Sequence, residues 1–94
     1  MSDRIARRLV VEGRVQGVSY RDWTLRKARA FGLDGWVRNR ADGSVEILLC
    51  GPERAVADMI AACRRGPPLA RVDGVRVAPA ETPAAPGFAR LPDA

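Results

Sequence analysis

A glycine-containing loop followed by an arginine is the feature of the sequence best suited to chemistry. The segment from Gly13 to Arg21 leads from a predicted strand into the first turn of a predicted helix. Such a loop exposes backbone N–H groups that no helix carbonyl accepts, and together with the helix dipole they form a site for an anion. Arg21 adds a positive charge where the helix itself disfavours one, and a bound dianion would offset that cost. These residues fit either a phosphate-binding loop or an ordinary turn with an exposed arginine.

The elements that must position this loop follow from the spacing of apolar residues. Alternation and helical stripes predict four strands and two helices, with the turn at Asp42–Gly43 joining the second and third strands as a hairpin. The predicted strands cover 5–13, 33–40, 44–50 and 69–78, the helices run over 20–31 and from Gly51–Pro52 to Gly66, and 87–91 is a candidate edge strand. Ser19 and Asp22 have the spacing of a capping box at the first helix.

The order strand, helix, strand, strand, helix, strand is typical of a ferredoxin-like α+β sandwich, in which two helices cover one face of an antiparallel sheet. In that topology the third strand lies between the first and the second, which run parallel to each other. Their carboxyl ends therefore meet at one edge of the sheet. Arg21 follows the first strand and Asn39 ends the second. Taken alone, Asn39 is better explained by a capping role in the following turn, but the shared edge brings it toward the loop.

Length and composition indicate a single domain over 1–94, with a core from about 5 to 91. The chain has 94 residues, of which 47% are hydrophobic, and no apolar run approaches the ~20 residues of a membrane helix. The N-terminus has no apolar signal region behind it, so we expect a cytoplasmic protein. The sequence contains no histidine, and Cys50 and Cys63 are too far apart for a paired-cysteine motif, so we expect no metal site. Both cysteines are predicted to be reduced, half-buried thiols.

The basic charge leaves the class of anionic partner open. The net charge is +5 and Lys27 is the single lysine among sixteen basic residues. Such a balance attracts either a nucleic acid or a phosphorylated metabolite, although arginines on solvated faces account for most of it. An RNA-recognition sheet carries stacking aromatic residues on its central strands, and here Trp36 is the only aromatic residue in the first three predicted strands. Nucleic acid is therefore the less favoured partner.

Two long motifs carry a resemblance to a known family. The segment from Gly13 to Arg21 resembles the first signature of the acylphosphatase family, and the segment from Gly35 to Glu46 resembles the second. The likeness covers roughly residues 5–91. It implies the ferredoxin-like fold, a small-molecule acyl phosphate as substrate, and hydrolysis of its carboxyl-phosphate bond to a carboxylate and inorganic phosphate without metal or cofactor. We expect a monomer.

The resemblance also implies roles for individual residues, by position in the two motifs. Arg21 would bind the phosphoryl group and Asn39 would orient the attacking water. The loop amides that would assist Arg21 are those of Gln16, Gly17, Val18, Ser19 and Tyr20. Tyr20 stands where the family usually has phenylalanine, so its hydroxyl needs a partner if it is buried. The segment after Phe88 matches the family weakly.

Two other functions remain open from the sequence. One is a basic, ferredoxin-like nucleic-acid-binding module, and the other is a phosphate-binding module without activity. Hydrolysis of a simple acyl phosphate distinguishes the enzyme from both. Asp22 and Asp42 lie near the candidate site, but a capping role and a turn role are the simpler expectations for these two carboxylates.

Overall fold

The computed structural model describes residues 4–94. Residues 1–3 lie outside the described residues. They include the start of the predicted domain and of the N-terminal segment predicted to lack a signal region. The elements, in chain order, are β1 (Arg4–Arg14), α1 (Tyr20–Ala30), β2 (Asp34–Asn39), β3 (Val45–Pro52), α2 (Glu53–Arg65), β4 (Arg71–Pro79) and β5 (Phe88–Arg90). Every predicted strand and helix is present, and the candidate edge strand at 87–91 is β5.

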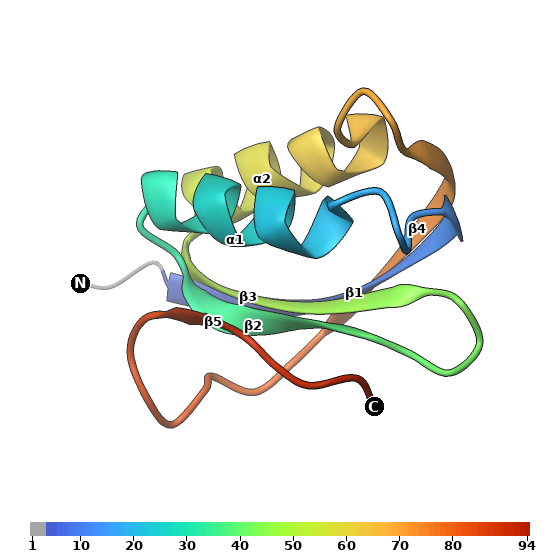
Figure 1. Cartoon of the computed structure of the whole chain (residues 1–94). Coiled ribbons are helices and arrows are strands. Elements are labelled where there is room, and N and C mark those ends of the chain that lie inside the picture. The colour runs from blue at the N-terminus through green and yellow to red at the C-terminus, as the bar shows by residue number, and fades with distance from the viewer. Residues whose placement is uncertain (1–3) are drawn as a thin grey trace.

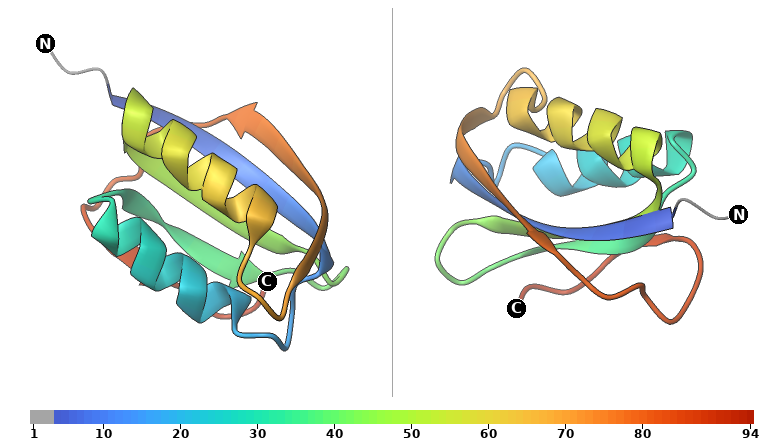
Figure 2. Two further views of the ribbon diagram at one scale, coloured as in Figure 1. Left: turned by 90° about the horizontal axis from the view of Figure 1, so that it is seen from above. Right: turned by 180° about the vertical axis from the view of Figure 1, so that it is seen from behind.

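The sheet has the strand order β4-β1-β3-β2-β5, which confirms the ferredoxin-like α+β arrangement. The first four strands pair antiparallel, and β5 pairs parallel with β2 at the edge. Both helices lie on one face of the sheet, while the connection from β4 to β5 crosses the opposite face (Figures 1 and 2). Within the described residues, no helix is long and apolar enough to span a membrane.

The core lies between the helices and the sheet, where the predicted apolar faces meet. Leu9 and Val11 of β1 and Ile47 and Leu49 of β3 have no exposed surface. They pack with the stripes of the two helices, whose buried members are Tyr20, Thr24, Ala28, Val56, Met59, Ala62 and Cys63. Burial of such side chains is the main stabilising contribution, at about 1.5–3 kcal/mol for each large one. The sheet and helices therefore form a rigid base for the loops.

Gly35 shows how closely two strands approach at the edge that carries β5. A Cβ on Gly35 would lie 1.9 Å from the carbonyl oxygen of Leu48, and the Gly35 backbone has φ = 135°. No other residue fits there without moving β2 away from β3.

Three sequence expectations are corrected by the structure. Ser19 occupies the N-cap position of α1 without any side-chain capping bond, because its backbone has φ = 64° rather than the extended conformation that side-chain capping requires. Asp22 instead contacts Arg90. Pro52 precedes α2 as its N-cap residue rather than lying in its first turn. Cys50 and Cys63 are free, as predicted, but fully rather than half buried, because both face closely packed elements.

The topology brings the carboxyl ends of β1 and β2 to the same end of the sheet. The loop 15–19 leaves β1 there and enters α1, next to the hairpin that joins β2 to β3 (Figure 1). Arg21 and Asn39 therefore come from different elements that converge at this end.

Candidate active site

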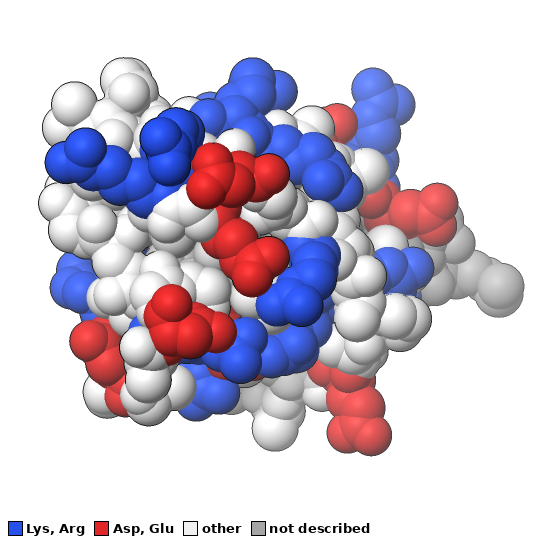
Figure 3. Space-filling view, turned by 90° about the vertical axis from the view of Figure 1, so that its right-hand side faces the viewer, with Lys and Arg blue, Asp and Glu red and all other residues white. Residues whose placement is uncertain are grey.

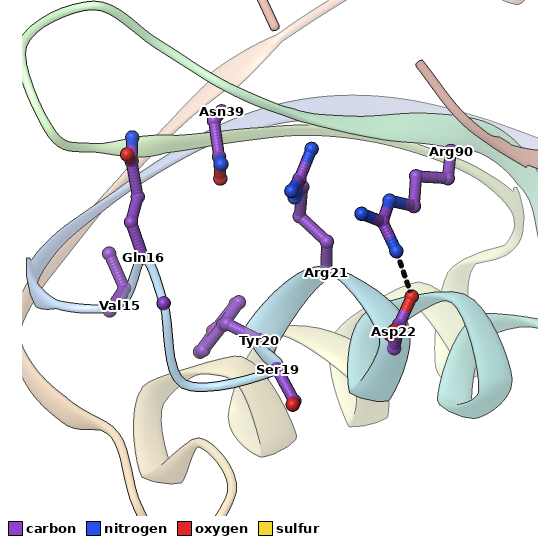
Figure 4. Close-up of a pocket in the computed structure, with 9 residues that line it drawn as sticks. Val15, Gln16, Ser19, Tyr20, Arg21, Asp22, Asn39 and Arg90 are labelled. Atoms are coloured by element: carbon purple, nitrogen blue, oxygen red, sulfur yellow. Dashed lines mark hydrogen bonds and ion pairs between the residues drawn. The ribbon is translucent and has the colours of Figure 1, made fainter. Parts of the chain in front are cut away.

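A cavity of about 280 Å³ lies at this end of the sheet (Figure 4). Its lining comes from the loop before α1, the first turn of α1, the end of β2 and β5, and consists of Val15, Gln16, Gly17, Ser19, Tyr20, Arg21, Asp22, Asn39 and Arg90. Six of the seven predicted catalytic and substrate-binding residues are in this set. The seventh, Val18, packs its side chain against the core, and the role predicted for its backbone amide stays a prediction.

The loop backbone contains two residues with a left-handed conformation. Gly17 and Ser19 have φ = 74° and φ = 64°, and Ser19 is the one non-glycine residue with positive φ among residues 4–94. Alternation of left-handed residues turns successive N–H groups toward one side, which forms a concavity for an anion. Within the described part of the chain, no backbone hydrogen bond is donated by the amides of residues 16–19. A strained residue kept in such a loop is a hint of function.

The Gln16 side chain fixes the loop to the β2–β3 hairpin. Its Nε2 donates to the carbonyl oxygens of Arg40 and Ser44, each at 2.9 Å. Asp42 in turn accepts hydrogen bonds from the backbone N–H and the hydroxyl of Ser44, which lower the pKa of the Asp42 carboxyl. The predicted turn role of Asp42 is therefore confirmed, and the hairpin holds the loop beside the end of β2.

Tyr20 anchors the start of α1 in the core. Its side chain is 1% exposed, and its hydroxyl donates to the carbonyl oxygen of Cys63 at 2.8 Å. This is the partner that a buried tyrosine was expected to need. Burial raises the pKa of Tyr20 far above its ordinary value, so the phenol is neutral at physiological pH and serves as a fixed support.

Arg21 extends from the first turn of α1 toward the C-terminal segment. Its Nη1 lies 2.8 Å from Oδ1 of Asp93, and the side chains are 24% and 63% exposed. The exposed Asp93 carboxylate thus accepts from one of the N–H donors of Arg21. An ion pair at the surface is weak, so a phosphate can replace this carboxylate.

Asn39 is buried at the end of β2, with 7% of its surface exposed. Its backbone carbonyl accepts a hydrogen bond from the amide of Ala94 at 2.9 Å. Its side-chain Oδ1 is buried and has no hydrogen-bond partner within the described residues. Figure 4 shows the side chains of Asn39 and Arg21 directed into the same space, while the Ser19 hydroxyl points away. The carboxyl ends of β1 and β2 lie at the same end of the sheet, as the topology predicted, and this arrangement brings Asn39 and Arg21 together.

Sequence reasoning missed Arg90 and Val15. Val15 is 1% exposed and is one of the residues that line the cavity. Arg90 reaches the cavity because it lies two residues after the buried Phe88 on β5, and it contacts Asp22 of α1 (Figure 4). Strand alternation after Phe88 was the one signal that pointed to it.

The surface around this end of the molecule carries charges of both signs. Figure 3 shows basic and acidic side chains interspersed over it rather than a field of one sign. A groove for the nucleic-acid backbone carries clustered positive charge instead. The arrangement suits a small anion held by a few directed groups.

Comparison with known proteins agrees with the geometry. Residues 7–89 match the family described as Acylphosphatase. A protein named Acylphosphatase from Rhodospirillum rubrum is 58% identical over 87% of this chain and 90% of its own length. Another of that name, from Rhizorhabdus wittichii, is 56% identical over 96% and 91%. The crystal structure of acylphosphatase from Bacillus subtilis superposes with a TM-score of 0.87 at 36% identity, covering 93% of this chain and 98% of that one. The chain belongs to the acylphosphatase family, a family of hydrolases.

Proposed function

We propose that this chain hydrolyses the carboxyl-phosphate bond of small acyl phosphates, releasing a carboxylate and inorganic phosphate. The observation that carries the proposal is the convergence of Arg21, Asn39 and the amide-rich loop on one cavity. Phosphoryl transfer depends mainly on positioning and on stabilisation of charge. These groups supply both.

Arg21 and the loop amides hold the phosphoryl group. A guanidinium binds two phosphate oxygens in a fork, and the backbone N–H groups of residues 16–20 bind the others at the positive end of α1. On binding, the phosphate takes the place of the Asp93 carboxylate on Arg21. One anion replaces another, so Arg21 is never left without a partner.

Asn39 holds the attacking water. Its buried Oδ1 lacks a partner, and an unsatisfied buried acceptor is costly unless something fills it in the working state. A water O–H donated to Oδ1 fits that need and fixes the water for in-line attack on phosphorus. As the resemblance to the family implies, the substrate phosphate itself accepts the proton of the water, and the sequence has no histidine to act as a general base.

The remaining parts of the proposal concern the setting of the enzyme. We place it in the cytoplasm, because both cysteines are unpaired and such thiols persist in a reducing compartment. We propose a single domain over residues 1–94, in keeping with the one core between the helices and the sheet, and we propose that it acts as a monomer. Nucleic acid is not the partner, in keeping with the mixed charges around the cavity (Figure 3).

The proposal is tested by hydrolysis of benzoyl phosphate, with 4-nitrophenyl phosphate as the monoester control. Arg21→Ala and Asn39→Ala should each lower kcat/KM by roughly 10²-fold or more, because each removes a group that acts on the transition state. The matched control is Arg26→Ala, an exposed arginine on the same helix, which should retain wild-type turnover. Near-normal turnover by the Arg21 and Asn39 variants would contradict the assigned roles, and absence of turnover in the wild type would contradict the function.

A further inference from the structure

Arg90 enters the cavity from an element that the two motifs do not include. β5 pairs parallel with β2, with Phe88 beside Gly35 and Arg90 beside Val37. Residues that alternate along a strand share a face. Phe88 is buried in the core, so Arg90 lies on the same, helix-facing side of the sheet, one step nearer the cavity. Its presence there follows from the register of β5 and involves neither signature motif.

The contact with Asp22 holds Arg90 in place without using up its donors. Nη1 of Arg90 donates to Oδ1 of Asp22, and the two side chains are 40% and 47% exposed. A guanidinium has five N–H donors, so the remaining groups stay available to a ligand in the cavity. A side chain that is already oriented loses less conformational entropy when it binds.

The positions of the three polar groups along the cavity suggest what Arg90 meets. Figure 4 shows Arg90 on the side of Arg21 that is away from Asn39. In-line displacement requires the attacking water and the leaving oxygen on opposite sides of phosphorus. With the water at Asn39 and the phosphoryl group at Arg21, the acyl part of the substrate extends toward Arg90.

The walls of the cavity also favour a polar acyl group. Its two apolar side chains with substantial bulk, Val15 and Tyr20, are each 1% exposed and present almost no surface. The other lining side chains are polar or charged. An aliphatic or plain aromatic acyl group therefore finds little apolar surface to cover, whereas an anionic group finds a second arginine.

We propose that Arg90 is a specificity-determining residue that selects acyl phosphates whose acyl part carries a second negative charge, such as a carboxylate. The proposal rests on the proposed function of the same cavity. A purely structural role, in which Arg90 only fastens β5 to α1, is the competing explanation. It predicts that loss of Arg90 affects charged and uncharged substrates alike.

The experiment compares benzoyl phosphate with 3- and 4-carboxybenzoyl phosphate, three rigid substrates that differ in the added carboxylate and its direction. The wild type should show a higher kcat/KM for at least one carboxylated substrate, by roughly two- to fivefold as expected for a partly exposed ion pair. Arg90→Gln should bring that ratio to about one, and Arg90→Lys, which keeps the charge, should restore part of it. Arg54→Gln makes the same charge change on α2, where the Arg54 side chain is 90% exposed, and should leave the ratio as in the wild type.

Binding of the matching benzoylphosphonates, in which a P–C bond replaces the scissile P–O bond, gives a readout that needs no turnover. Calorimetry should show the same preference for the carboxylated analogue and its loss in Arg90→Gln. A wild-type ratio near one, or an equal loss for both ligands in Arg90→Gln, would overturn the role of Arg90. If no acyl phosphate is hydrolysed but the binding preference depends on Arg90, the proposed reaction fails while the anion selectivity stands.

Discussion

At the scale of single residues, the Asn39 side chain is expected to contribute to activity but little to stability. Its backbone is paired within the sheet, but its buried Oδ1 has no partner in the described structure. A buried polar atom without a hydrogen bond costs free energy on folding. Natural proteins keep such a cost at functional sites, where it is compensated in the working complex.

We therefore expect Asn39→Ala to leave the stability nearly unchanged while turnover is lost. The substitution removes the buried Oδ1 that has no partner, which is a gain in stability, and leaves a small cavity, which is a cost. Because the two effects offset each other, the free energy of unfolding should change by less than about 1 kcal/mol. Urea denaturation followed by circular dichroism measures the change. The control is Tyr20→Phe, which removes the donor to the Cys63 carbonyl and should destabilise by about 1–2 kcal/mol. A larger loss in Asn39→Ala than in Tyr20→Phe would show that Asn39 is needed for the fold.

At the scale of elements, the C-terminal segment is fastened to the start of α1 by two ion pairs of opposite sense. α1 contributes the cation to one and the anion to the other, in the pairs Arg21–Asp93 and Arg90–Asp22. The amides of Leu91 and Ala94 continue the contact with the end of β2 by donating to Val37 and Asn39. The segment after β5 thus lies beside the cavity and places a carboxylate on the residue proposed to hold phosphate.

Because Asp93 and the substrate compete for Arg21, Asp93→Asn should tighten binding of phosphate. We expect a roughly two- to fivefold lower KM for benzoyl phosphate and a matching decrease in the inhibition constant of inorganic phosphate, in keeping with the strength of an exposed ion pair. Steady-state kinetics at low salt provide the measurement. Asp58→Asn on α2 makes the same change of charge away from the cavity and should leave both constants unaltered. An increase in KM in Asp93→Asn would instead mean that Asp93 positions Arg21 for the substrate.

At the scale of the whole molecule, ionic contacts tie the strands together and set the response to pH. Glu46 of β3 is 4% exposed and accepts from Arg8 of β1 and Arg38 of β2. Burial raises the pKa of Glu46, but the hydrogen bonds and charges of the two arginines outweigh it, so the pKa lies below its ordinary value of 4.5. At Asp34 a backbone hydrogen bond from Gly87 likewise lowers the pKa. Burial raises the pKa of the Cys63 thiol to about 12.

These shifts predict a stability that is flat near neutrality and falls in acid. A carboxyl with a lowered pKa in the folded state contributes stability above its unfolded pKa and loses that contribution as pH falls through the folded value. The chain has no histidine, so no side chain of that type titrates between about pH 5.5 and 7.5. The free energy of unfolding, measured by urea denaturation at a series of pH values, should stay constant there and decrease below about pH 4.5.

Glu46→Gln is the variant that checks the cause of the acid response. It should be less stable than the wild type at pH 7, because Arg8 and Arg38 lose a buried charged partner, and its stability should depend less steeply on pH in acid. A steep change in the wild type between pH 5.5 and 7.5 would contradict the assignment to carboxylates.

The sequence by itself determined the order of the elements, their faces and the position of the loop. These features depend on residues that are close in the chain, such as the stripe of Val56, Met59 and Cys63 or the turn at Asp42–Gly43, and local periodicity records them directly. The topology rules then placed Asn39 at the same sheet edge as Arg21. The two motifs, from Gly13 to Arg21 and from Gly35 to Glu46, indicated the family to which the chain belongs.

The tertiary structure alone decided how the cavity is completed. The partners of Arg21 and Arg90 lie 72 and 68 residues away in the sequence, and contacts between such distant residues leave no periodic pattern. The left-handed backbone of Ser19 replaced the expected side-chain cap, because anchoring of the loop by Gln16 and of the helix by Tyr20 outweighs the local preference of serine. The sequence therefore specified a loop able to bind phosphate, and the packing of β5 and the C-terminal segment decided what surrounds it.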